Sequence, residues 1–118
     1  MKKGIPEKGD IVNIRIDDGV GIEMKPGKFE TRFALVVSEY DFNEDGLCVV
    51  ALISNGVGPS TYPNMRVTLA GHKTTGAVFP AFTMSVDFKA RGAKFVEKAD
   101  SAVVDEFEGM HDAILGRS

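Results

Sequence analysis

Short blocks of hydrophobic residues, separated by glycine and polar clusters, recur along most of the chain, and this pattern is typical of β-rich proteins. Residues 10–16 alternate between apolar and polar positions, which predicts a half-buried strand. The run 32–38 is mostly apolar and predicts a strand buried on both faces, and the run 47–53 predicts a second apolar strand. Residues 17–31 show no periodicity, so we expect a long loop there.

The middle of the chain continues with shorter extended segments and more turns. We expect strands at 65–69, 76–79 and 82–88 and a short extended segment at 93–99. Pro80 should separate two of these strands, because proline cannot donate to a sheet ladder. Residues 39–46 should form a connection with a short turn, and residues 70–73 a reversal.

Near the C-terminus the hydrophobic period changes from about two to about 3.6 residues. Apolar side chains recur there at helical spacing: Val103, Phe107, Met110 and Ile114. Asp100 or Ser101 can cap the start of this helix, and Gly116 can end it. We therefore expect a single mostly β domain over residues 1–118, with one C-terminal amphipathic α-helix packed on a sheet.

Charge is unevenly distributed along the chain. Residues 59–98 hold six cations and two anions, a net charge of +4. Since the whole chain carries −3, the remainder carries −7. A basic segment in an acidic protein can attract phosphate groups, or it can be a solvated face that the acidic part balances.

The sequence predicts a cytoplasmic protein with no membrane partner. Its longest uninterrupted apolar run, 47–53, has seven residues, too few to span a bilayer, and the basic N-terminus has no apolar stretch behind it. The single cysteine, Cys48, lies within that apolar run and is expected to be an inert core thiol.

Few residue types in the sequence can support metal or nucleophilic chemistry. His72 and His111 lie 39 positions apart, and with one cysteine they form no ligand set of recognisable spacing. We therefore expect no metal and no cofactor. His111 lies beside the apolar stripe of the helix and is expected to be a core or edge residue.

Arg32 and Ser54 are the strongest candidates for phosphate chemistry. Arg32 begins one apolar strand and Ser54 ends the next, so both lie at strand ends that can share a cleft. Arginine's planar fork suits a phosphodiester and can stabilise the charge of a phosphorane. The alternative is that Arg32 pairs with an acid nearby, such as Glu23 or Glu30.

From residue 7 to residue 115 the chain resembles the MazF/PemK/Kid family of toxin endoribonucleases. The residues that carry the resemblance are Lys8-Gly9-Asp10-Ile11-Val12, Arg32 with 34–38, Phe42-Asn43, Ser54, Val67-Thr68-Leu69, Thr74-Thr75-Gly76 and 86–94. The resemblance implies a small SH3-like β-barrel of the CcdB/MazF type, a homodimer, and a cognate antitoxin as partner. It also implies metal-independent cleavage of single-stranded RNA, in which the 2′-hydroxyl attacks its own phosphate and leaves a cyclic phosphate.

The resemblance also assigns candidate residues. Arg32 matches the family's phosphate-stabilising arginine, Ser54 its hydroxyl partner, and Glu23 an acid of the first long loop. Candidate RNA contacts come from the basic segment: His72, Lys73, Thr74, Thr75, Lys89 and Arg91. Glu23 or His72 would have to supply proton transfer, and His72 can instead be an exposed residue at the tip of a hairpin.

The chain departs from the family pattern on one strand. Kid-like members carry Arg, Asp, Gln and Arg there, and this chain has Phe79, Ala81, Phe82 and Met84. In addition, Phe33 replaces a proline and Ile22 a histidine. The new apolar side chains can form a stacking surface, or they can fill the core or a dimer interface. A second function therefore competes with the ribonuclease: a non-catalytic protein of this fold that binds nucleic acid or an antitoxin, or a CcdB-like topoisomerase poison.

Overall fold

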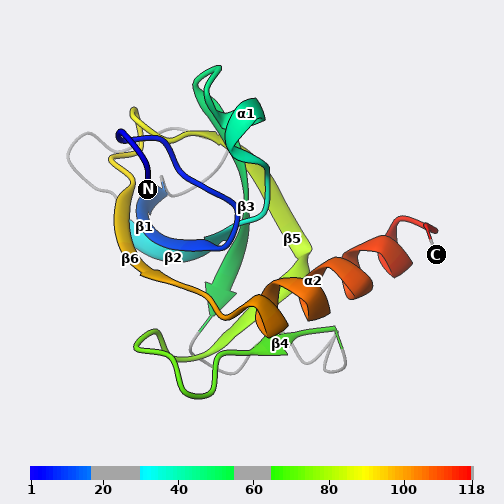
Figure 1. Ribbon diagram of the computed structural model, residues 1–118. Helices are drawn as coiled ribbons and strands as arrows, with labels where there is room; N and C mark the ends of the chain where they lie inside the picture. The colour runs from blue at the N-terminus through cyan, green and yellow to red at the C-terminus, as the bar shows by residue number, and fades with distance from the viewer. Residues whose placement is uncertain (17–29, 55–64, 118) are drawn as a thin grey trace.

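The computed structural model describes residues 1–16, 30–54 and 65–117, and these form six strands and two helices. In chain order the elements are β1 (Asp10–Ile16), β2 (Glu30–Val36), α1 (Tyr40–Asn43), β3 (Leu47–Ser54), β4 (Val67–Thr68), β5 (Ala77–Asp87), β6 (Lys94–Lys98) and α2 (Ser101–Ile114). Strands dominate and a helix ends the described chain, as the hydrophobic pattern predicts (Figure 1).

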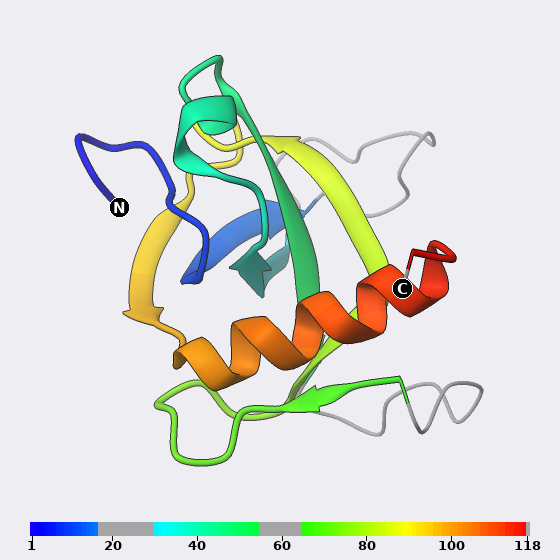
Figure 2. The ribbon, with the colours of Figure 1, turned by 45° about the vertical axis from the view of Figure 1, so that its right-hand side comes forward.

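All six strands belong to one antiparallel sheet with the order β4-β5-β3-β2-β1-β6. The sheet curls into a half-barrel, so that β6 and β5 lie on opposite sides of the opening in Figure 1. Helix α2 contacts β4 and β5 and runs across one end of the curled sheet (Figure 2). The fold class expected from the sequence, a small β-barrel type with a C-terminal helix, is therefore confirmed.

Two hydrophobic clusters use alternate residues of the same strands, as expected of a sheet covered on both faces. The first contains Ile11 of β1 and Leu35 of β2 together with Val103 and Phe107 of α2. The second contains adjacent residues of β1 and β2, together with residues of β3, of β5 and of the turn after β5: Val12, Ile14, Ala34, Val36, Cys48, Val50, Val86 and Phe88. Met1 and Ile5 from the N-terminal segment pack against this second cluster.

Strand β2 is buried only in its C-terminal half, so the prediction of burial on both faces is wrong for residues 32 and 33. The cause is its pairing. β2 pairs with β1 from Glu30 to Leu35, but its pairing with β3 begins at Ala34, opposite Leu52. Residues 30–33 therefore have a partner strand on one side only, and Phe33 remains 40% exposed.

Strand β5 is continuous through Pro80, so the expected break at that residue is wrong. The ladder with β3 is irregular here, since Ile53 pairs with Val78 whereas Ala51 pairs with Thr83. A proline is tolerated at such an irregularity because no ladder hydrogen bond from its nitrogen is needed. The expected turn within 39–46 contains a four-residue helix, α1.

Helix α2 follows the predicted period, with Val103 and Phe107 buried. Asp100 occupies the N-cap position, but its side chain makes no capping hydrogen bond. Gly116 has a φ of +74°, the left-handed conformation that ends helices at glycine. The stripe is buried only in its first half, because Ile114 lies near the C-terminal end of the helix and is 41% exposed.

Candidate functional site

Arg32 and Ser54 lie on one face of the sheet, on neighbouring strands. The pairing between β2 and β3 ends at Ala34 and Leu52. Arg32 and Ser54 each lie two residues beyond this pair, where β2 and β3 no longer pair with each other. Because side chains two residues apart on a strand share a face, both project from the face of Ala34 and Leu52. On its other side, Ser54 pairs with Ala77 of β5.

Among the residues that the structure describes, Glu30 is a charged partner of Arg32, and its Oε2 lies 4.0 Å from an Nη atom of the arginine. The two side chains are 47% and 61% exposed. An exposed pair at this distance contributes little to stability and is screened by salt. The expected pairing with Glu30 is thus present, and the guanidinium still has the exposure that contact with a phosphate requires.

Strands β3 and β5 carry several apolar side chains. Leu52 and Met84 are half-buried and pack against the second cluster, whereas Phe82 is 40% exposed. Phe79 is buried, and its ring meets that of Phe82 edge to face, with the centroids 6.1 Å apart. Both alternatives for the apolar residues of β5 therefore apply: Phe79 fills the core, and Phe82 presents an exposed aromatic ring.

The turn between β4 and β5 is tied to the far edge of the sheet. The carboxylate of Glu97 on β6 accepts hydrogen bonds from the Lys73 amide at 3.1 Å and from the Thr74 amide and hydroxyl at 2.6 and 2.7 Å. Burial of Glu97 acts to raise its pKa, but these hydrogen bonds outweigh that effect and lower it. The Thr74 hydroxyl is therefore committed to a structural contact.

His72 does not match the expectation of an exposed hairpin tip, because its side chain is only 5% exposed. Its Nε2 accepts a hydrogen bond of 3.0 Å from the amide of Asp100, the residue that precedes α2. The imidazole thus joins the turn to the start of the helix. Lys73 and Thr75 of the same turn are exposed.

The other candidate RNA contacts lie in the turn that follows β5. Lys89 is exposed. Arg91 donates to the backbone oxygen of Arg15 at 3.2 Å, and its own carbonyl accepts from the Arg15 amide at 2.9 Å. The turn is thereby fixed to the end of β1.

Three further expectations concern the remaining chemistry-bearing residues. Glu23 lies outside the described residues. Cys48 is buried, and burial raises the pKa of its thiol to about 11, which agrees with an inert core cysteine. His111 stacks on Phe107 of α2, with the ring centroids 5.3 Å apart.

Within residues 1–16, 30–54 and 65–117, no group of three or more His, Cys, Asp or Glu side chains is placed to hold a metal ion. In the same ranges, no helix has the length and apolar character needed to cross a membrane.

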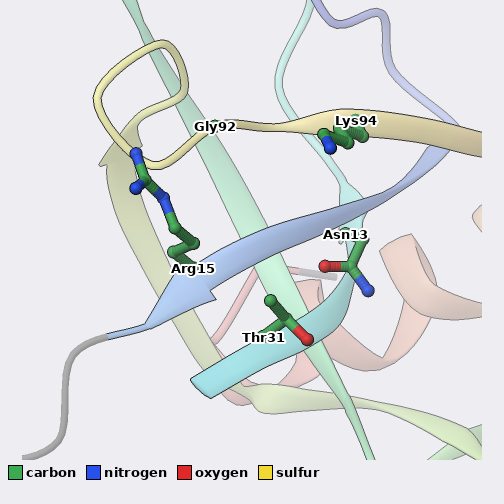
Figure 3. Close-up of a pocket in the computed structure, with 5 residues that line it drawn as sticks. All are labelled: Asn13, Arg15, Thr31, Gly92 and Lys94. Carbon is green, nitrogen blue, oxygen red and sulfur yellow. The ribbon is translucent and has the colours of Figure 1, made fainter. Parts of the chain in front are cut away.

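A pocket of about 400 Å³ opens where β1, β2 and β6 meet, and it was not expected from the sequence. Five residues line it: Asn13, Arg15, Thr31, Gly92 and Lys94. In Figure 3, Arg15 extends from β1 toward the turn at Gly92, and Asn13 extends toward Thr31. The available signal was the alternation in β1, which places the two polar residues Asn13 and Arg15 on one face.

The chain matches a family model described as the PemK-like, MazF-like toxin of type II toxin-antitoxin systems over residues 7–110. Endoribonuclease PemK of Escherichia coli is 30% identical over 117 residues, which cover 97% of this chain and 85% of PemK. Endoribonuclease toxin ChpB of Escherichia coli strain K12 is 33% identical over 108 residues, 90% of each chain.

Solved structures give the same picture of the fold. A MazE-MazF crystal structure from Deinococcus radiodurans (Form-III) superposes with a TM-score of 0.80 at 26% identity, covering 97% of this chain and 99% of the other. An endoribonuclease in complex with its cognate antitoxin from a mycobacterial species has a TM-score of 0.71 at 16% identity, covering 100% and 98% of the two chains. The second likeness concerns the fold alone.

Proposed function

This chain belongs to the PemK-like, MazF-like toxin family of type II toxin-antitoxin systems, and we propose that it is an endoribonuclease that cleaves single-stranded RNA. The observation that supports this most is that Arg32 and Ser54 project from one face of the sheet, near the ends of the neighbouring strands β2 and β3. An arginine fork and a hydroxyl on adjacent strands can contact the same phosphate. As an enzyme acting on mRNA, the protein would work in the cytoplasm.

In the proposed reaction the RNA supplies its own nucleophile. The 2′-oxygen forms a bond to phosphorus as its proton leaves, the bond from phosphorus to the 5′-oxygen breaks, and the departing 5′-oxygen takes up a proton. The products are a 2′,3′-cyclic phosphate and a 5′-hydroxyl. Negative charge grows on the non-bridging oxygens during this step, and Arg32 would stabilise it while Ser54 donates one neutral hydrogen bond.

Proton transfer requires a further group, and we propose Glu23 for it. The other candidate from the sequence is His72, whose side chain is buried. Its Nε2 already accepts a hydrogen bond from the amide of Asp100, the residue before α2. A general base must be able to reach the proton it removes. Loss of activity in Glu23→Gln, with RNA binding retained, would support the assignment.

We propose two macromolecular partners in addition to a second copy of the chain. Exposed Lys73, Thr75 and Lys89 offer contacts to single-stranded RNA beyond the cleaved linkage. An acidic antitoxin segment would be attracted by the same positive charge. A solved MazE-MazF structure at 26% identity supports the second partner.

The competing function is binding without cleavage, by a protein of this fold that holds nucleic acid, an antitoxin or a topoisomerase. One observation favours it: Phe82 is an exposed aromatic ring on the strand where Kid-like members carry polar groups. Fold alone does not decide between the two. A binding protein would retain its ligand but release no cleaved RNA.

The deciding experiment is incubation of the purified protein with a long RNA in excess EDTA, followed by analysis of the fragment ends. Cyclic phosphate and 5′-hydroxyl ends that depend on Arg32 support the ribonuclease. Intact RNA that co-purifies with the protein supports binding without cleavage. Arg117→Gln, on an exposed residue after α2, is the control for a general effect of losing one positive charge.

A further inference from the structure

Strands β6, β1 and β2 place five side chains on one face in two adjacent rows. Asn13 of β1 pairs with Lys94 of β6 on one side and with Phe33 of β2 on the other. Two residues further along β1, Arg15 pairs with Thr31. Because cross-strand partners project from the same face, the row Lys94–Asn13–Phe33 lies beside the row Arg15–Thr31.

One end of this arrangement is hollow and positively charged. Arg15 and Lys94 line the pocket of about 400 Å³, together with Asn13 and Thr31 (Figure 3). The guanidinium of Arg15 donates to the Ala90 carbonyl at 2.7 Å, which fixes its orientation. Two cations with an amide and a hydroxyl are suited to a phosphate group, which accepts several hydrogen bonds.

Gly92 gives the pocket its shape. Its φ is +58°, and a Cβ built there would lie 3.3 Å from Nε of Arg15. A side chain at this position would be strained by the backbone conformation, and the Arg15 side chain would have to shift by a few tenths of an ångström. The close approach of the turn is therefore part of the geometry that holds Arg15.

The other end of the first row is aromatic. Phe33 is 40% exposed and lies on β2 directly opposite Asn13, while Lys94 lies on the other side of Asn13. Two strand spacings, about 10 Å, separate the backbone positions of the ring and the ammonium group. A flat exposed ring at this distance from a cationic pocket is an arrangement that receives a base and its phosphate.

We infer that Phe33, Asn13, Lys94, Arg15 and Thr31 form a nucleotide subsite for single-stranded RNA. Phe33 stacks on a base and the pocket holds a phosphate. The inference rests on the proposed function and extends it, because Thr31 and Arg32 are consecutive on β2 and project from opposite faces. The subsite therefore holds a nucleotide other than the pair joined by the cleaved linkage.

The aromatic ring favours RNA over an acidic polypeptide as the occupant. A carboxylate needs only the cations, whereas a nucleotide also uses a flat apolar face and groups that both donate and accept. Phe33 supplies that face, and Asn13 and Thr31 each supply a donor and an acceptor. These three side chains have no role in a purely electrostatic contact with an acidic segment.

The test measures binding of a fluorescent 2′-O-methyl oligonucleotide of mixed sequence, which lacks the free 2′-hydroxyl and cannot be cleaved by the proposed route. Phe33→Leu should weaken binding about tenfold, as expected for one lost base stack, and Phe33→Tyr should retain it. Lys94→Gln should lower the slope of log K against log salt concentration by about 0.7, the value for one phosphate contact with a single strand. Lys3→Gln, at an exposed residue in the N-terminal turn, is the matched control and should change neither quantity.

The outcomes separate this inference from the proposed function. If wild type cleaves RNA through Arg32 but Phe33→Leu and Lys94→Gln bind the oligonucleotide like wild type, the subsite is wrong and the ribonuclease stands. If both variants weaken binding of poly-glutamate but not of the oligonucleotide, the pocket is an acidic-polypeptide site. If wild type neither binds nor cleaves RNA, both proposals are wrong. Near-ultraviolet circular dichroism of each variant shows whether it has kept its fold.

Discussion

Glu97 accepts two hydrogen bonds from Thr74, one from its amide at 2.6 Å and one from its hydroxyl at 2.7 Å. Glu97 belongs to β6, one edge of the sheet, and Thr74 to the turn between β4 and β5 at the other edge. This contact therefore joins the two ends of the strand order and holds the curl of the half-barrel. The His72 hydrogen bond to the Asp100 amide ties the same turn to α2.

The Glu97 contact predicts a pH-dependent contribution to stability. The net effect of its hydrogen bonds is to lower the pKa of Glu97 below its ordinary value of 4.5. A carboxyl with a depressed pKa in the folded state stabilises the fold at pH values above its unfolded pKa, and this stabilisation is lost as pH falls through the folded pKa. Urea unfolding should therefore show Glu97→Gln to be less stable than wild type at pH 7, and the difference should shrink at pH 3.

The control for this experiment is Glu106→Gln, at an exposed residue of α2. It should show no comparable loss of stability at pH 7. A difference between wild type and Glu97→Gln that is the same at pH 7 and pH 3 would show that the charge of Glu97 is not involved.

Much of the fold could be predicted because local pattern and tertiary burial agree. Val103 and Phe107 recur at helical spacing and are the residues that α2 buries. Errors arose where burial depends on partners far away in sequence. Phe33 is exposed because β3 does not pair with that part of β2, and Pro80 fits within a strand because of an irregularity in the ladder. Neither fact can be read from the local sequence.

The site was predictable only as far as single residues carry chemistry. Arg32 and Ser54 could be chosen because each lies at the end of an apolar run, and both project from one face of the sheet, two residues beyond the last pair of β2 with β3. His72 was misjudged as an exposed residue because its burial depends on the start of α2, 28 residues away. The pocket between β1, β2 and β6 could not be predicted, because it depends on the pairing of β1 with β6.

Dimerisation is the next expectation. Phe82 is exposed, and Leu52 and Met84 are half-buried on the face that carries Arg32. An apolar patch of this kind favours association with a second copy. Light scattering at micromolar concentration should give about 25 kDa, twice the 12.7 kDa of one chain. Phe82→Glu should shift the mass toward that of the monomer, and a wild-type mass of about 13 kDa would show that this face does not mediate a dimer.

An acidic partner segment should bind in a salt-dependent manner. The exposed cations Lys73, Lys89 and Lys94 belong to the part of the chain whose net charge is positive. At ordinary salt concentrations, dissolved ions largely screen the attraction between exposed charges that lie more than about 8–10 Å apart. Calorimetry with an acidic antitoxin segment should therefore show affinity falling as salt is raised from 50 to 500 mM. Binding that is indifferent to salt would require an apolar interface instead.

Ser54→Ala should slow RNA cleavage modestly. The change removes a neutral hydroxyl, and one neutral hydrogen bond is worth about 0.5–1.5 kcal/mol, a factor of roughly 2 to 13 in rate. Ser54→Thr should retain most of the activity because it keeps the hydroxyl. Single-turnover cleavage of one RNA by the three proteins measures the effect. A loss of a thousandfold in a folded Ser54→Ala protein would instead assign Ser54 a role beyond one neutral hydrogen bond.

Arg32→Ala should reduce cleavage far more, by on the order of a hundredfold or more, the effect typical of removing one donor that stabilises transition-state charge. Arg32→Lys should recover only part of the rate, because an ammonium is a point charge and cannot hold two non-bridging oxygens in one plane. Neither variant should lose stability, since Arg32 is 47% exposed and its pairing with Glu30 at 4.0 Å is weak.

Glu30→Gln is the matched control for Arg32, because it removes the same ion pair and leaves the guanidinium in place. It should cleave at close to the wild-type rate. If Arg32→Ala remains folded and cleaves RNA as fast as wild type, the phosphate must be stabilised elsewhere and the site at the ends of β2 and β3 is wrong. If Glu30→Gln loses as much activity as Arg32→Ala, the ion pair, and not direct contact between arginine and phosphate, accounts for the effect of Arg32.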